Sequence, residues 1–108
     1  MIKANFESKG GRIFKGTISG HANFADANDI VCASVSSVSF AILNGIENVI
    51  GLTFGYEVRD GFLTFVMPDD MQPQQADRVG DLLDTFYLYL IELEKDYQDN
   101  IKVSKTEV

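Results

Sequence analysis

The sequence contains very little cysteine and histidine: Cys32 is its single thiol and His21 its single imidazole among 108 residues. One cysteine excludes a disulfide within the chain, and with it a small secreted scaffold stapled by disulfides. One cysteine and one histidine are also too few for a four-ligand zinc site of the Cys/His type. We therefore expect no metal and no cofactor, and a reducing compartment such as the cytoplasm.

Positive charge is scarce as well, with 9 Lys and Arg residues against 16 Asp and Glu residues and a formal net charge of −7. This balance argues against direct binding of nucleic acid, which depends on neutralising phosphates. Nine of the acidic residues lie between Asp69 and Asp99, where Arg78 and Lys95 are the only cations. Such a segment is either a solvated surface that keeps the protein soluble or a surface that attracts a basic protein.

The sequence also lacks a long unbroken apolar run and an export signal. The first ten residues alternate between apolar and polar side chains, whereas an export signal has an unbroken apolar stretch after a basic start. No unbroken apolar run approaches the roughly 20 residues that a membrane-spanning helix needs. We therefore expect no membrane partner and a location in the cytoplasm.

The chain has the length and composition of one globular domain, which we place at residues 1–108. Strand-like alternation and helix-like spacing of apolar residues follow one another along it. The expected strands are 2–7, 12–19, 49–57, 61–67 and, with a weaker pattern, 101–105; the expected helices are 30–44 and 74–97. The order β-β-α-β-β-α-β predicts an α+β fold with two helices on a mixed, mainly antiparallel sheet.

Turn and capping residues predict where these elements end. Residues 8–11 contain two glycines and residues 58–61 contain Asp-Gly, both typical of hairpin turns. Asp29, or Asn28 beside it, is expected to cap the helix at 30–44, and Gly45 is expected to end that helix. Residues 21–29 follow no period and are expected to form a loop.

Cys32 falls in the first turn of the helix expected at 30–44, and His21 follows the strand expected at 12–19. A helix N-terminus favours a thiolate through its free N–H groups and its dipole, and those groups are also able to stabilise the oxyanion of an attacked carbonyl. A histidine from the neighbouring loop is able to act as general base. The two residues therefore predict covalent acyl transfer; the alternative is a packed structural cysteine and an exposed loop histidine.

Two short segments carry a resemblance to a known family. The triplet GHA at 20–22 is followed by DIVCASVS at 29–36, on a helix whose expected end is LNG at 43–45. This combination resembles the ribosomal-processing cysteine proteases called Prp, and in length and element order the resemblance extends over the whole chain. It implies a cysteine endopeptidase, typically a homodimer, that removes a short N-terminal extension from bacterial large-subunit ribosomal protein number twenty-seven.

The resemblance also implies roles for individual residues. Cys32 matches the nucleophile, and His21 matches the base that then gives its proton to the leaving amine. Asp29 matches an acidic residue that either orients His21 or caps the helix. Ser36, one turn after Cys32, offers a hydroxyl to the thiolate or the substrate, or else only packs closely. Gly20 is expected to give the loop its freedom.

The loop at 23–28 departs from the family pattern because it contains no glycine. A stiffer loop is expected to change the opening and closing of the site more than its chemistry. Asp26, within this loop, is a second candidate to orient His21. We expect the apolar surface near Phe24 and the sheet to hold apolar side chains of the substrate.

Partners and alternative functions complete these expectations. The expected substrate is the extended ribosomal protein; the alternative is a non-catalytic acidic module that binds a basic ribosomal protein or an assembly intermediate. A redox-sensing thiol has little support because the chain has no resolving cysteine. Four aromatic residues on the helix at 74–97 either form a homodimer contact or cap the core of a monomer: Phe86, Tyr87, Tyr89 and Tyr97.

Overall fold

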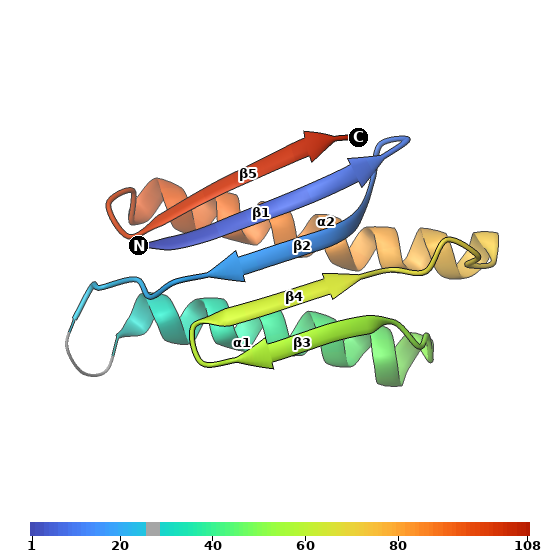
Figure 1. The fold of residues 1–108 in the computed structure, drawn as a ribbon, viewed down its shortest axis with the longest axis horizontal. Helices are drawn as coiled ribbons and strands as arrows, with labels where there is room; N and C mark the ends of the chain where they lie inside the picture. The colour runs from blue at the N-terminus through green and yellow to red at the C-terminus, as the bar shows by residue number, and fades with distance from the viewer. Residues whose placement is uncertain (26–28) are drawn as a thin grey trace.

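The computed structural model describes residues 1–25 and 29–108. Its elements are β1 (Ile2–Lys9), β2 (Arg12–Ser19), α1 (Ile30–Asn44), a π-helical segment η1 (Gly45–Ile50), β3 (Gly55–Arg59), β4 (Phe62–Val66), α2 (Pro73–Asp96) and β5 (Ile101–Glu107). Five strands form one sheet in the order β3-β4-β2-β1-β5 (Figure 1). β1 and β5 run parallel and the other neighbours run antiparallel, so the predicted α+β class and element order are confirmed.

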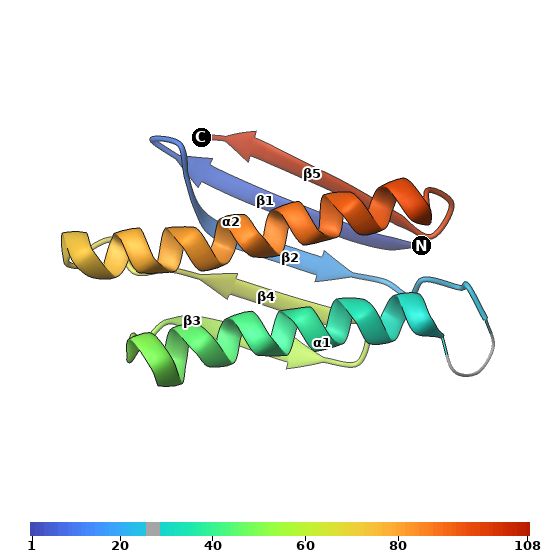
Figure 2. The same ribbon diagram turned by 180° about the vertical axis from the view of Figure 1, so that it is seen from behind.

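Both helices cover the same face of the sheet, α2 over β1 and β2 and α1 over β4 and β3 (Figure 2). The alternation in β1 buries Ile2, Ala4 and Phe6 on this face, and β4 adds Leu63 and Phe65. Phe86 of α2 is fully buried and meets Phe6 edge to face, with ring centroids 5.5 Å apart. The apolar core therefore lies between the sheet and the two helices.

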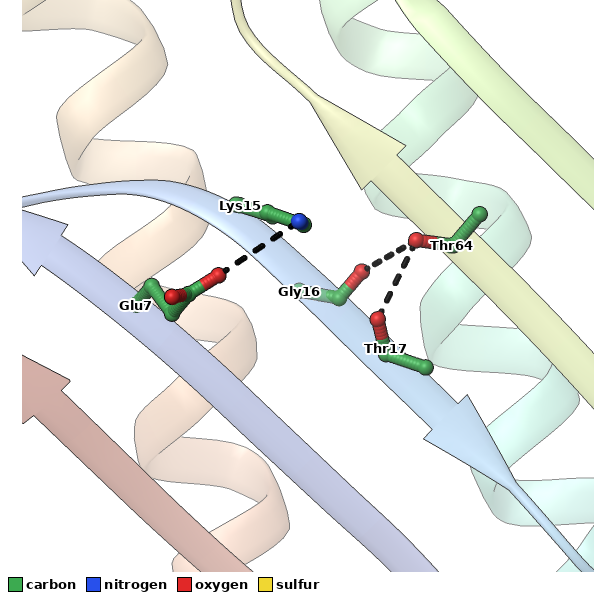
Figure 3. A network of polar contacts seen from close by, with 5 residues as sticks. All are labelled: Glu7, Lys15, Gly16, Thr17 and Thr64. Carbon is green, nitrogen blue, oxygen red and sulfur yellow. Dashed lines mark hydrogen bonds and ion pairs between the residues drawn. The ribbon is translucent and has the colours of Figure 1, made fainter.

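The other face of the sheet carries polar side chains that pair across the strands (Figure 3). The hydroxyls of Thr17 and Thr64 lie 3.1 Å apart across β2 and β4, and the Thr64 hydroxyl donates to the Gly16 carbonyl. Glu7 and Lys15 form an ion pair across β1 and β2, at 3.7 Å. Cross-strand polar pairs suit a solvated face, which explains why the helices gather on the opposite one.

The first helix extends past the residue that was expected to end it. Gly45 has helical dihedrals (φ −61°, ψ −43°), and the chain continues as η1 to Gly51, whose φ of +80° ends the helix. The continuation buries Ile46 completely. Gly45 lies against the second helix, because an added Cβ would approach Leu82 Cδ1 to 3.4 Å. The expectations of a stop at Gly45 and of a strand from residue 49 were therefore wrong; β3 begins at Gly55.

Together α1 and η1 make one apolar helix. The 21 residues Ile30–Ile50, with a mean hydropathy of 1.6, are long and apolar enough to cross a membrane by length and composition alone. The helix is not an unbroken apolar run, because serine, asparagine and glutamate residues interrupt it. Val31, Ile42 and Ile46 are buried against the rest of the fold, as in the core helix of a folded domain.

The aromatic residues of α2 and its end divide between the core and the surface. Phe86 is buried, Tyr87 stacks edge to face with Phe6 at 5.5 Å, and Tyr97 packs edge-on with Phe24 at 5.3 Å. Tyr89 is 41% exposed. Three of the four rings therefore pack within the chain, and Tyr89 remains available for a contact with another molecule.

Candidate active site

The end of β2, the start of α1 and the turn between β3 and β4 lie at the same end of the molecule (Figure 1). A pocket of about 180 Å³ opens there, between α1 and the β3-β4 hairpin. Its lining includes four of the residues singled out from the sequence, namely Gly20, His21, Cys32 and Ser36. The tertiary structure thus brings the thiol, the imidazole and the hydroxyl to one pocket.

Cys32 is the third residue of α1 and is partly buried. The backbone N–H of Ala22 donates to its Sγ over 3.3 Å. This donor comes from the residue next to His21, so the segment after β2 folds back onto the sulfur. A backbone N–H aimed at sulfur stabilises negative charge there, as a nucleophilic thiolate requires.

Asp29 caps α1. Its Oδ1 accepts hydrogen bonds from the N–H groups of Val31 (3.0 Å) and Cys32 (3.1 Å), and its Oδ2 accepts from Phe24 (3.0 Å) and Ala25 (3.4 Å). Among the described residues it makes no hydrogen bond or ion pair with His21. The carboxylate therefore fastens the segment after His21 to the start of the helix.

Two consequences follow from this cap. Desolvation of the Asp29 carboxylate raises its pKa, but the hydrogen bonds from Cys32, Phe24, Ala25 and Val31 outweigh that effect and hold the pKa below its ordinary value. The N–H groups of Val31 and Cys32 are also occupied by Asp29. That N–H groups of the helix start stabilise an oxyanion stays a prediction; the N–H aimed at the sulfur belongs to Ala22.

The imidazole of His21 lies against the β3-β4 turn. Its Nε2 is 3.8 Å from Asp60 Oδ2. A Cβ added to Gly61 would lie 2.7 Å from the same nitrogen, so the ring rests on the Gly61 backbone. In addition, the N–H of Gly20 donates to the Gly61 carbonyl over 2.8 Å. Asp60 and Gly61 were expected only as turn residues, and no sequence signal connected them with His21.

Gly20 is needed for a different reason from the one expected. Its φ is +93°, in the region that favours glycine, and a Cβ at this position would collide with the carbonyl oxygen of Met1. Gly20 therefore allows a close approach between the end of β2 and the N-terminus. Gly20 was expected to give the loop its freedom; what the structure shows is a backbone geometry that requires glycine at this position.

The apolar wall of the pocket differs from the expected one. Phe24 is outside the lining and packs on Tyr97, whereas Phe40, Val58 and Phe62 line the pocket. Phe40 and Val58 also line a neighbouring groove of about 600 Å³ that extends past Tyr56 and Glu47. The expected apolar surface therefore lies between α1 and the hairpin.

Other expected site features fall into three cases. Ser36 is exposed and lines the pocket one turn after Cys32. Asp26 lies outside the described residues. In the described part of the chain, no cluster of three or more His, Cys, Asp or Glu residues is arranged to hold a metal ion.

The family model for the cysteine protease Prp matches residues 1–102. This chain belongs to the cysteine protease Prp family. The ribosomal processing cysteine protease Prp of Bacillus subtilis strain 168 is 30% identical over 90 residues, which cover 81% of this chain and 80% of that protein. Membership assigns the chain to a family of ribosomal-processing proteases that work through a cysteine.

Solved structures share the Prp fold. The ribosomal processing protease Prp from S. aureus, in complex with a covalently linked product peptide, has a TM-score of 0.86 at 24% identity and covers 97% of this chain and 99% of its own. SMU.848 from Streptococcus mutans has a TM-score of 0.83 at 23% identity, and the match covers 100% of this chain and 96% of SMU.848. At these identities the likeness shows that the fold is common to all three proteins.

Proposed function

We propose that residues 1–108 form a single catalytic domain, a cysteine endopeptidase with Cys32 as nucleophile and His21 as general base. One observation carries the proposal: the single cysteine of this cysteine protease family member lines the same pocket as its single histidine. The chain has no second thiol, which supports Cys32 as the nucleophile.

The reaction follows from the groups in the pocket. His21 takes the proton from Cys32 Sγ, and the thiolate attacks the scissile carbonyl carbon. The C–N bond breaks as the imidazolium gives its proton to the leaving amine, which leaves a thioester on Cys32. His21 then takes a proton from a water molecule, and the resulting hydroxide attacks the thioester. The C–S bond breaks as the imidazolium returns that proton to the leaving sulfur, which releases the free thiol and a carboxylic acid that ionises to the carboxylate.

The proposed proton transfer requires His21 and Cys32 to come within hydrogen-bond distance of each other. None of the hydrogen bonds of the described residues joins His21 to Cys32, while the Ala22 N–H points at the sulfur. Catalytic hydrogen bonds are often long in free enzymes and shorten when substrate binds. We assign to Ala22 the stabilisation of the thiolate before attack, and to the Ser36 hydroxyl a contact with the thiolate or the substrate in the pocket.

The proposed substrate is large-subunit ribosomal protein number twenty-seven with its N-terminal extension, in the cytoplasm. The relative from Bacillus subtilis is named as a ribosomal processing protease, which supports this choice. The net charge of −7 also suits a basic ribosomal protein, because opposite net charges speed the encounter of two proteins.

Cleavage of the extended ribosomal protein of the same organism tests the proposal. The unsubstituted protein should remove the extension, and Cys32→Ala and His21→Ala should each abolish cleavage without lowering Tm. Cys32 should also react with iodoacetamide in the folded protein well below pH 8. Full cleavage by either variant would overturn the assignment, and binding without cleavage would favour the non-catalytic acidic module.

A further inference from the structure

We propose that the β3-β4 turn positions the imidazole of His21, with Gly61 as the surface on which the ring rests and Asp60 as the carboxylate that orients it. Asp60 is thus a positioning residue. This inference rests on the proposed function, since it concerns the base of the same site. It assigns the orienting role to a carboxylate other than Asp29 and Asp26.

The hydrogen bonds of Asp29 leave this role open. Both of its carboxylate oxygens accept backbone N–H groups, which Val31 and Cys32 provide on one side and Phe24 and Ala25 on the other. Of the carboxylates in the described part of the chain, Asp60 is the one within ion-pair distance of the ring, at 3.8 Å from Nε2.

Contacts with Gly61 fix the place of the ring. A Cβ at position 61 would lie 2.7 Å from Nε2, 3.1 Å from Cε1 and 3.3 Å from Cδ2 of His21, so any other residue would displace the imidazole. The turn also holds the residue before His21, because the Gly20 N–H donates to the Gly61 carbonyl over 2.8 Å. Position and orientation of His21 therefore both depend on a turn 40 residues further along the chain.

This placement selects the nitrogen that acts as base. Nε2 faces Asp60 and Gly61, so a proton on Nε2 points at the carboxylate and Nδ1 is left to accept the thiol proton. The Asp60 side chain is 97% exposed, and an exposed ion pair adds little stability. Asp60 therefore acts through the tautomer and direction of the ring, and the 3.8 Å separation closes when the imidazole takes up the proton.

Kinetics of Asp60 variants provide the first test. Asp60→Ala should lower kcat about tenfold with KM changed less than twofold, and Asp60→Glu should recover most of the loss. Asp70→Asn, which removes the same charge from another exposed turn, should leave both constants unchanged. Equal effects of Asp60→Ala and Asp70→Asn on kcat would overturn the proposal.

The tautomer of His21 provides a test that needs no activity. Because His21 is the only histidine, its ring nitrogens give a single set of ¹⁵N signals, measurable in the Cys32→Ala protein. With the imidazole neutral, the Nε2–H form should dominate, and Asp60→Ala should shift the signals towards a mixture. Unchanged signals would overturn the proposal, whereas a shift in a protein that cleaves nothing would reject only the proposed function.

A pair of glycine variants tests the contact with the ring. Gly61→Ala should change the His21 signals and lower kcat more than it raises KM. Gly10→Ala is the matched control, because Gly10 has a similar φ of +60°, against +67° for Gly61, and nothing within 4 Å of an added Cβ. Both variants should lower Tm alike; His21 signals that respond to neither, or to both, would contradict the proposed contact.

Discussion

Asp29 connects more groups around the site than the other side chains described there. Four backbone N–H groups converge on its carboxylate, two from the first turn of α1 and two from the segment after His21. A negative charge at this position also complements the positive end of the helix dipole. Of the two roles that the sequence left open for Asp29, the hydrogen bonds of the described residues show the cap, and none of them joins Asp29 to the imidazole.

We expect Asp29→Ala to lower Tm by about 5 °C, because the helix loses its cap and the preceding segment its anchor. Cleavage should fall in the same variant, since Cys32 and Ala22 are no longer held together. Asp29→Asn keeps an acceptor for the N–H groups of the helix, and its Tm should fall by less than half as much as that of Asp29→Ala. Thermal unfolding and cleavage rates measure both effects, and a Tm equal to that of the unsubstituted protein would refute the anchoring role.

At the scale of elements, β5 is tied to the hairpin that joins β1 and β2. The Glu107 carboxylate accepts hydrogen bonds from the Ser8 hydroxyl (2.8 Å) and from the N–H groups of Gly10 (2.7 Å) and Gly11 (3.3 Å). The hydrogen bond from Ser8 is the main cause that lowers the Glu107 pKa, against a smaller opposite effect of desolvation. The end of the edge strand thus depends on an ionised carboxylate.

This lowered pKa predicts a loss of stability in acid. A carboxyl group whose pKa is lower in the folded than in the unfolded state stabilises the fold above its ordinary pKa of 4.5. That contribution disappears as the pH falls through the lower, folded-state value. The free energy of unfolding of the unsubstituted protein, measured with urea, should therefore decrease below about pH 4.5. The free energy of unfolding of Glu107→Gln should decrease less over the same pH range. Parallel pH curves for the two proteins would contradict this.

The β3-β4 hairpin also forms a wall of the pocket, which predicts its role in substrate binding. Val58 lines both the pocket and the neighbouring groove, and Val58→Asp should raise KM about tenfold while kcat stays within twofold, because apolar contact is lost along the peptide. Val66 is the control, since it is 44% exposed against 42% for Val58 and lines neither the pocket nor the groove. Val66→Asp should leave KM unchanged.

Periodicity and capping residues predicted most elements, and particular residues show where such prediction stops. Alternation located β1 and β2, and Asp29 marked the start of α1 because a cap acts within three residues. Gly45 was misplaced as a terminator because its helical conformation depends on the burial of Ile46 in the core. Asp60 and Gly61 were missed at the site because only sheet pairing brings their turn to His21.

At the scale of the whole molecule, an exposed groove runs between the two helices. It is lined by Ile30, Ala33, Ser34, Ser37, Val38 and Tyr89, and Ile30 and Tyr89 are 51% and 41% exposed. We propose this surface as the contact of a homodimer, since small residues on α1 allow close approach and Tyr89 supplies an aromatic anchor.

The mass in solution tests the dimer. Light scattering should give twice the chain mass of 12.0 kDa, and Tyr89→Glu should shift the protein towards the single chain without lowering the Tm of the separated chain. Leu88→Glu, on the neighbouring position and 60% exposed, lies outside the groove and should leave the mass unchanged. A 12.0 kDa particle for the unsubstituted protein would contradict the dimer.

The sequence by itself determined most of the elements, the cap of α1 and the identity of the only thiol and the only imidazole. These depend on periodicity and on hydrogen bonds between residues a few positions apart, which act before the chain is packed. Only the tertiary structure decided that η1 prolongs the first helix, that the hairpin forms the pocket wall, and that His21 faces Asp60 and Gly61. The pairing of β2 with β4 brings the hairpin to His21, and it connects segments more than 40 residues apart that no local pattern relates.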